Sequence, residues 1–225
     1  MATAVAPTSR TRSARARSIK PRHVVLASLA LMMIVVWFNR DHMLLHASSP
    51  LRERYAPIWW LMLLHGIPGA IALFLGVFQF SSRLRQRHLQ WHRVVGRIYV
   101  GSVFIAAPAA VIVSIKLPIP TLLLASIIQA VGWIVTTATA LYCVRTGQIQ
   151  QHREWMIRSY PFAMVFVVGR AINAIPAVAN LGEMGSVAVV WGVIAVAAFL
   201  PSFLIEWQKL AAGRRAIKAR AALAS

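Results

Sequence analysis

The sequence predicts an all-α fold, a polytopic membrane helical bundle of six spans, and three observations support this. First, 59% of its 225 residues are hydrophobic and the mean hydropathy is +0.66, whereas soluble domains are about 45–50% apolar. Second, apolar runs of about 20 residues recur along the chain, each long enough to cross a hydrocarbon layer of about 30 Å. Third, Lys and Arg gather in alternate connections, as in multi-pass proteins.

The chain begins with a basic stretch of 22 residues, MATAVAPTSRTRSARARSIKPR, that contains no acid. This composition cannot bury a core, so residues 1–22 are predicted to form a disordered cytoplasmic tail. The composition also fits a mitochondrial presequence. The next run, His23–Phe38, is the first and shortest predicted span, and a cleaved signal peptide is the alternative to a retained helix.

A transmembrane domain is predicted over residues 23–207, followed by a basic cytoplasmic tail over residues 208–225. A short outer connection over residues 39–56 follows the first span. The single cysteine, Cys143, excludes an intrachain disulfide and a thiolate cluster for zinc or iron–sulfur. The five later spans are predicted at Pro57–Phe80, Val94–Ile115, Ile119–Val144, Ser159–Ala179 and Ser186–Ile205.

The distribution of Lys and Arg predicts that both termini are cytoplasmic. If the N-terminus is inside, 19 of the 24 basic residues fall in inner segments, four fall in outer segments, and Arg170 lies within a span. The opposite orientation would invert this asymmetry, against the positive-inside rule. We therefore expect a multi-pass protein of the bacterial inner (plasma) membrane.

The charge and the motifs exclude several classes of function. A net charge of +19 would suggest nucleic acid in a soluble protein, but here the cations lie in tails and loops and no folded basic reader is visible. No glycine-rich phosphate loop, GxSxG, HExxH or carboxylate pair is present, so the sequence favours a protein that is not an enzyme and predicts no catalytic residue. No metal site is predicted.

Two inner segments resemble each other. The first reads HLQWHRVVGRIYV, from His88 to Val100, and the second reads QHREWMIRSYPF, from Gln151 to Phe162. Each contains His-Arg, a further Arg, and a Tyr two residues later, and each precedes a helix that runs from inside to outside. Spans two–three and four–five could therefore be two related hairpins.

These segments are interpreted as inner loops that face anions. Arg and His at an inner helix start are ordinary topology signals, but several cations at a helix N-terminus oppose the macrodipole and favour an anion. Lipid phosphate, a specific anionic ligand and the carboxylates of a cofactor are all consistent with this pattern. The residues concerned are His92, Arg93, Arg97, Tyr99, His152, Arg153, Arg158 and Tyr160.

The strings HGIPGAIALFLGVFQFSSRLRQR, WHRVVGRIY and HREWMIRSY, with the later VGRAINAIP, resemble a bacterial family of predicted multi-pass membrane proteins, domain of unknown function 2306. The resemblance covers about His65 to Pro176, and it implies a membrane protein without assigning an activity. After the membrane arginine this chain has Ala171, Ile172 and Asn173 in place of the aliphatic or aromatic residues expected from the family. The matching positions are His65, Gln79, Phe80, His92, Arg93, Gly96, Arg97, Tyr99, His152, Arg153, Trp155, Met156, Arg158, Tyr160, Arg170 and Pro176.

Arg170 interrupts the apolar stretch VFVVGRAINAIP. It lies about nine residues, or about 14 Å, from the outer end of the fifth span, and a charge at such depth costs about 2.5–3.5 kcal/mol on insertion scales. No Asp or Glu occurs at this depth in any span. The neutral partners predicted for it are His65, Gln129 and Asn173, with the carbonyl of Leu64 that Pro68 frees.

We therefore predict an intramembrane ligand pocket formed by His65, Gln129, Arg170 and Asn173. A cation with only neutral partners favours a bound anion. A structural arginine that holds helices together, and a contact in an oligomer such as a homodimer, are the alternatives.

Three functions are consistent with these features. The first is an accessory or lipid-interacting protein whose partners are the bilayer and its anionic headgroups. The second is a small transporter subunit for an anionic or neutral solute. The third is a redox protein that binds haem or quinone, in which His92 and His152 form a pair near the inner surface. The cofactor itself stays unknown.

Overall fold

The computed structural model describes residues 50–116 and 120–224, together with Val24, Ala27, Ser28, Leu31, Met32 and Ile34. The predicted tail 1–22 and most of the first predicted span, His23–Phe38, lie outside the described residues. Within the described part the chain forms helices and no strand, which confirms the all-α prediction there. The helices are α2 (Pro50–Tyr55), the 3-10 turn η2 (Ala56–Ile58), α3 (Trp59–Gln79), α4 (Ser82–Arg87), α5 (Leu89–Lys116), α6 (Pro120–Arg145), α7 (Ile149–Asn173), α8 (Pro176–Ala179) and α9 (Gly182–Ala224).

Four helices in the described ranges are long and apolar enough to cross a membrane: Ala56–Gln79, Leu89–Lys116, Pro120–Arg145 and Gly182–Leu223. They correspond to the second, third, fourth and sixth predicted spans. The prediction of six spans is not confirmed, because the first falls mostly outside the described residues and α7 is not among these four helices.

The fifth predicted span, Ser159–Ala179, differs from the helix that forms. Helix α7 begins ten residues earlier, at Ile149, and ends at Asn173. Ile175 is extended (φ −72°, ψ 123°) and Pro176 starts the separate short helix α8, because a residue before proline disfavours helical backbone. Helix α7 also carries buried polar side chains, among them Glu154 and Ser159.

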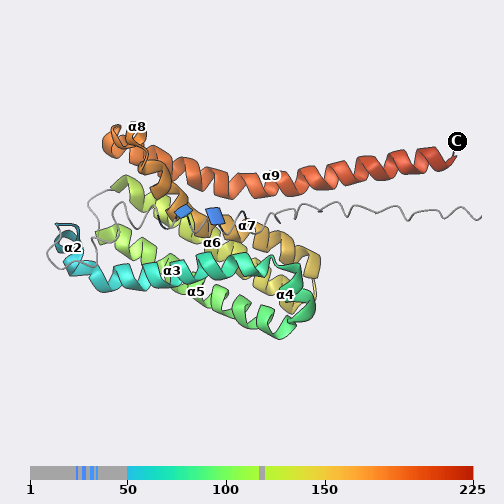
Figure 1. Ribbon diagram of the computed structural model, residues 1–225, viewed down its shortest axis with the longest axis horizontal. Helices are drawn as coiled ribbons and strands as arrows, with labels where there is room; N and C mark the ends of the chain where they lie inside the picture. The colour runs from blue at the N-terminus through green and yellow to red at the C-terminus, as the bar shows by residue number, and fades with distance from the viewer. Residues whose placement is uncertain are drawn as a thin grey trace, which may run out of the picture.

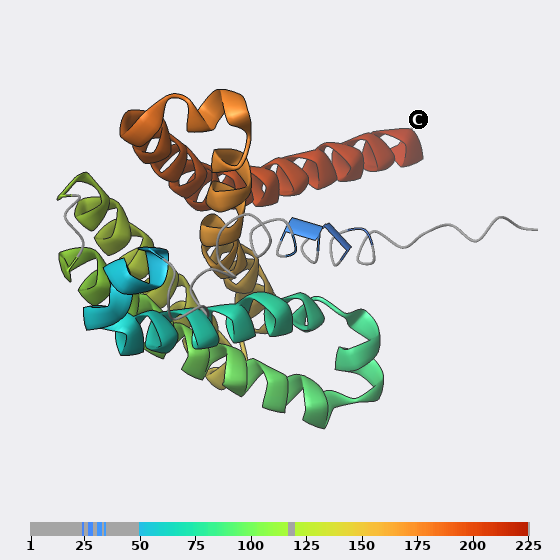
Figure 2. The same ribbon diagram turned by 60° about the vertical axis from the view of Figure 1, so that its left-hand side comes forward.

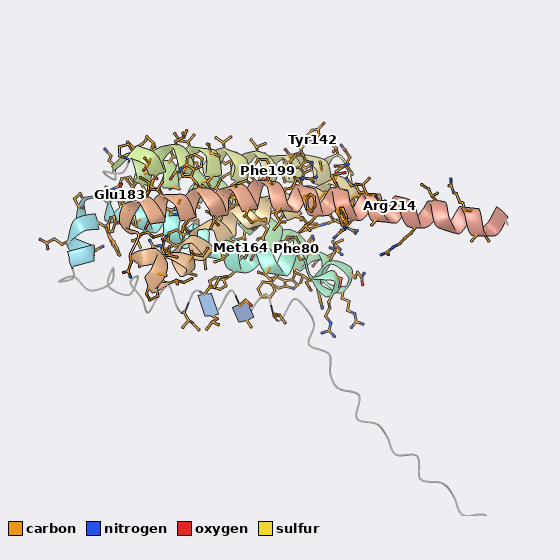
Figure 3. All side chains as sticks on the ribbon, turned by 90° about the horizontal axis from the view of Figure 1, so that it is seen from above. Phe80, Tyr142, Met164, Glu183, Phe199 and Arg214 are labelled. Carbon is orange, nitrogen blue, oxygen red and sulfur yellow. The ribbon has the colours of Figure 1, made fainter. Side chains whose placement is uncertain are left out.

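The last helix is much longer than the predicted sixth span, Ser186–Ile205. Gly182 adopts a positive φ of 67°, a conformation that favours glycine, and α9 then runs for 43 residues. The predicted C-terminal tail 208–225 continues this helix as far as Ala224. Figure 3 shows Arg214 on the part of α9 that projects beyond the other helices.

Helices α3, α5, α6 and α7 pack side by side as a bundle, and α9 packs against α7 (Figure 1). Helices α3 and α5 form one hairpin and α6 and α7 form another, and α5 packs against α6 to join them (Figure 2). Small residues allow this close approach, since Ala72, Ala106, Ala125 and Ala140 are almost completely buried.

One end of the bundle carries α4 and the turn between α6 and α7, and Phe80 and Tyr142 lie toward it while Glu183 lies toward the other (Figure 3). Ser81 caps α4 by accepting a hydrogen bond from the Leu84 backbone N–H. Gly147 has a φ of 77° in the second turn. We call this end the basic end, because its residues include Arg83, Arg85, Arg87, Arg93, Arg97, Arg145 and Arg153.

Two tyrosines, one from each hairpin, cross to the other hairpin. The Tyr99 hydroxyl on α5 lies 2.8 Å from the Ser159 hydroxyl on α7 and accepts a 3.2 Å hydrogen bond from the Trp133 indole on α6. The Tyr160 hydroxyl on α7 donates a 2.9 Å hydrogen bond to the Leu73 carbonyl on α3. These bonds satisfy buried polar groups, so they fix how the two hairpins face each other.

Gly76 on α3 is the point where the two rings meet. A Cβ atom at this position would lie 2.5 Å from Tyr160 Cε2 and 3.1 Å from Tyr99 Cε2. The absence of a side chain on α3 therefore makes room for both tyrosines, and it brings α3 close to α5 and α7.

We predict that Gly76→Ala destabilises the bundle, because the added methyl group must displace two hydrogen-bonded rings. Overpacking of this kind costs about 1–3 kcal/mol, so the midpoint of thermal unfolding in lipid nanodiscs should fall by several degrees. Gly69→Ala on the same helix is the matched control, because nothing lies within 4 Å of its Cβ position. An equal effect of both substitutions would contradict the packing described.

Candidate functional site

Apart from His88, the two repeated segments lie within helices and not in loops. Residues 89–100 form the first three turns of α5, and residues 151–162 lie in the first half of α7. His88 is non-helical (φ −136°, ψ 57°) and separates α4 from α5, and Gly147 turns the chain upstream of the second segment. The prediction of basic inner loops is thus wrong in its local structure, and the motif residues occupy helix faces with a period of about 3.6 residues.

A cavity of about 360 Å³ opens between the two hairpins at the basic end. It receives residues from both repeated segments, which the topology places on neighbouring helices. Its lining residues are Gln79 of α3; His92, Arg93, Gly96, Arg97 and Val100 of α5; Leu141, Val144 and Arg145 of α6; and His152 and Met156 of α7.

The charged groups of this cavity are all cations or histidines. Arg93, Arg97 and Arg145 are exposed, so the cavity is open to solvent where they lie. No Asp or Glu is among the lining residues. Three guanidinium groups without a carboxylate repel one another, and an anion in the cavity would relieve this repulsion.

The two histidines of the cavity differ in their hydrogen bonds. His152 Nδ1 lies 2.8 Å from the Ala140 carbonyl, which can only accept, so Nδ1 carries the proton and Nε2 is left to accept or to bind a metal. His92 Nδ1 is buried and has no hydrogen-bond partner. A buried polar atom without a partner is unusual and costs about 1–3 kcal/mol, so His92 has an unused donor or acceptor.

Gln79 closes the side of the cavity that faces α3. Its side chain is 8% exposed, and its Nε2 donates a 3.4 Å hydrogen bond to the His92 carbonyl. A Cβ on Gly96 would lie 3.2 Å from Gln79 Oε1. The pair Gln79–Gly96 therefore sets the distance between α3 and the first turns of α5.

The structure places the remaining motif residues elsewhere. Tyr99 and Tyr160 were predicted to face an anion or lipid, but they are 0% and 7% exposed and lie inside the bundle. The reason is packing, because their rings fill the space above Gly76. Arg153 is exposed on α7 and is not among the residues that line the cavity.

Arg158 belongs to a charge cluster that joins α7 to α9. Lys209 Nζ lies 2.8 Å from Glu154 Oε2 and 3.1 Å from Glu206 Oε1. Arg158 lies within 4 Å of both carboxylates and donates a 3.1 Å hydrogen bond to the Ser202 hydroxyl. Two of the chain's five acids thus neutralise Arg158 and Lys209, not the arginines of the cavity.

The predicted intramembrane residues lie in the other half of the bundle. His65 Nδ1 bonds to the Ala106 carbonyl at 2.9 Å, and Gln129 Nε2 donates a 3.2 Å hydrogen bond to the Phe162 carbonyl. The Phe166 ring joins two of the four residues: its centroid lies 6.0 Å from that of His65 and 4.3 Å from Arg170 Cζ. Asn173 Oδ1 is buried without a hydrogen-bond partner.

Sequence reasoning missed several residues of the cavity. Arg145 was counted only as a topology signal, and Gln79 and Met156 were noted only as positions of a resemblance. A usable signal was available for Arg145: in an α6–α7 hairpin, the last residue of α6 must lie at nearly the depth of the first turn of α7. The apolar residues Val100, Leu141 and Val144 carry no signal beyond their place in a span.

Glu154 makes stability depend on pH. The hydrogen bond from Lys209 holds the pKa of this carboxyl below its ordinary value of 4.5, although burial opposes this. Since the folded pKa is the lower one, the carboxylate contributes its full stabilisation above about pH 4.5, and this is lost as the pH falls through the folded pKa.

We expect Glu154→Gln to lower the midpoint of thermal unfolding by several degrees at pH 7, because it leaves Arg158 and Lys209 without a buried carboxylate. The difference from the unaltered protein should shrink as the pH falls below about 4.5. Glu183→Gln, at an exposed position of the opposite end, is the control and should change little at either pH. A difference that stays constant from pH 7 to pH 3.5 would rule out this role for Glu154.

A comparison with protein families agrees with this architecture. The family model described as "Predicted membrane protein (DUF2306)" matches residues 62–208, a range that contains the cavity, both repeated segments and most of the charge cluster. No curated protein and no solved structure is significantly similar to the chain. The chain therefore belongs to the DUF2306 family of predicted membrane proteins.

Proposed function

We propose that this protein is an accessory membrane protein whose basic end lies on the cytoplasmic side of the bacterial inner membrane and binds anionic lipid headgroups. The observation that carries the proposal is the placement of charge. The cations of α4, of the first turns of α5 and of the end of α6 all gather at the basic end, whereas Arg52 and Lys116 lie at the opposite end. Such asymmetry is typical of the cytoplasmic side.

The acids of the basic end do not cancel its charge. Glu154 and Glu206 pair with Arg158 and Lys209 within the α7–α9 cluster. The arginines of α4, Arg83, Arg85 and Arg87, belong to a helix with no acid. Each cation close to an anionic leaflet contributes about 1 kcal/mol of attraction, so a cluster of this size supports stable contact with phosphatidylglycerol or cardiolipin.

The group formed by His65, Gln129, Arg170 and Asn173 is a separate proposal for an intramembrane polar site. The shared contacts of Phe166 with His65 and Arg170 support it, as does the unused acceptor on Asn173. A ligand there would need a donor such as a hydroxyl for the amide oxygen.

Haem is the second candidate ligand, and one observation favours it. His92 and His152, from α5 and α7, line the same cavity, and the bond of His152 Nδ1 to Ala140 leaves Nε2 as a ligand. The cavity would have to widen for the macrocycle, since about 360 Å³ is the space of only about a dozen water molecules at ~30 Å³ each.

For lipid binding, we predict that phosphatidylglycerol nanodiscs raise the unfolding midpoint above that in phosphatidylcholine nanodiscs. The combined substitution of Arg83, Arg85 and Arg87 by Gln should remove at least half of this difference, because it deletes three cations outside the cavity. Lys116→Gln, an exposed change at the opposite end, is the control and should leave it intact. The same midpoint in both lipids would refute the proposal.

For haem, the measurement is the absorption spectrum of protein purified after haem-replete expression. Because the cavity is small, we expect no Soret band. A Soret band that is lost in His152→Ala, but kept in the His88→Ala control outside the cavity, would establish haem binding and displace lipid contact as the leading role.

A further inference from the structure

The cavity at the basic end has two unlike regions. On each of three helices, a cation or histidine lies nearer the basic end, and an apolar side chain lies about one turn further into the bundle. The pairs are Arg97 and Val100 on α5, Arg145 and Leu141 on α6, and His152 and Met156 on α7. The cavity therefore has a cationic rim and an apolar floor.

The volume of the cavity limits what it can hold. About 360 Å³ corresponds to the space of about a dozen water molecules at ~30 Å³ each, which is far less than the two acyl chains of a phospholipid occupy. It lies at the lower end of the range for small-molecule pockets, about 300–1,000 Å³. Tyr99, the residue before Val100, is fully buried, so the bundle is tightly packed at the depth of the floor.

The polar atoms of the cavity indicate which chemical groups its ligand carries. Three exposed arginines at the rim suit one carboxylate or phosphate group, which guanidinium groups bind with paired hydrogen bonds. The unpartnered Nδ1 of His92 adds one further polar contact in the wall. The apolar floor suits a short hydrocarbon or aromatic group.

We propose that this cavity binds a small, soluble organic anion: a carboxylate or phosphate monoester with one compact apolar group, which enters from the basic end. The anionic group lies among Arg93, Arg97 and Arg145, and the apolar group rests on Val100, Leu141 and Met156. This site is additional to the lipid contact of α4, and neither depends on the other.

The test is isothermal titration of the full chain in phosphatidylcholine nanodiscs, with phenyl phosphate and inorganic phosphate as probes. Phenyl phosphate should bind more tightly than inorganic phosphate, because only the former reaches the floor. Arg97→Gln should lower the affinity for phenyl phosphate by about tenfold or more, since a hydrogen bond to a charged group contributes about 1.5–3 kcal/mol. Arg87→Gln on α4 is the matched control and should leave the affinity unchanged.

A second variant tests the floor without changing charge. Val100→Phe reduces the space at the floor. It should therefore lower the affinity for phenyl phosphate several-fold and leave the affinity for inorganic phosphate unchanged. Equal binding of phenyl phosphate to the unaltered protein and to Arg97→Gln would overturn the proposal, and so would no binding at all. Arg97 is exposed, so its replacement leaves the fold intact even if Val100→Phe does not fold.

The source of the anion is decided by repeating the titration in phosphatidylglycerol nanodiscs. We expect phenyl phosphate to bind there as well, since the acyl chains of a lipid cannot enter the cavity. Its complete displacement by phosphatidylglycerol would show that a leaflet headgroup occupies the cavity and would overturn the proposal. If phosphatidylglycerol still raises the unfolding midpoint of Arg97→Gln, the lipid contact of α4 does not depend on the cavity.

Discussion

The crossing of Tyr99 and Tyr160 at Gly76 is the packing constraint that organises this molecule. Each tyrosine belongs to one hairpin and bonds to the other, and both rings occupy the space left by the glycine. Tyr99 follows His92 by seven residues and Tyr160 follows His152 by eight, which is about two helical turns in each case. Burying the tyrosines therefore turns both histidines toward the space between the hairpins, where the cavity forms.

The packing of the helices also separates the charged residues of the basic end into a paired cluster and a group of arginines without acids. Helix α7 places Glu154 and Arg158 one turn apart, where they meet Glu206 and Lys209 of α9. The two carboxylates are thus used to hold α9 against α7. Arg93, Arg97 and Arg145 of α5 and α6 have no acid among the residues that line their cavity, and this uncompensated charge is the basis of the anion binding that we propose.

The sequence was a good guide to the apolar helices and a poor guide to what lies between them. Hydropathy located α3, α5, α6 and the membrane part of α9 to within a few residues, because apolar runs of that length have few alternatives. The fifth predicted span was placed less well, because α7 begins ten residues before it and ends six residues before its predicted end, and its buried residues include the polar Glu154 and Ser159. The continuation of α9 past residue 207 was also not foreseen, since a basic composition does not itself end a helix.

The candidate site was predictable only in part. The repeated His-Arg strings were visible, and four of the eight residues predicted in them to face an anion, His92, Arg93, Arg97 and His152, do line one cavity. Gln79 of α3 and Arg145 of α6 line the cavity only because their helices pack against α5 and α7. No short sequence pattern predicts this packing. The burial of Tyr99 and Tyr160 depends on Gly76, a residue far from both in the chain.

We infer that a cluster of arginines without carboxylates at the basic end holds an anion. The decisive experiment is native mass spectrometry of the protein released from its own membranes. We expect a population heavier than the chain by the mass of a small organic anion, and the loss of that population in Arg97→Gln. A bare chain, or one that carries only neutral lipid in both proteins, would contradict it.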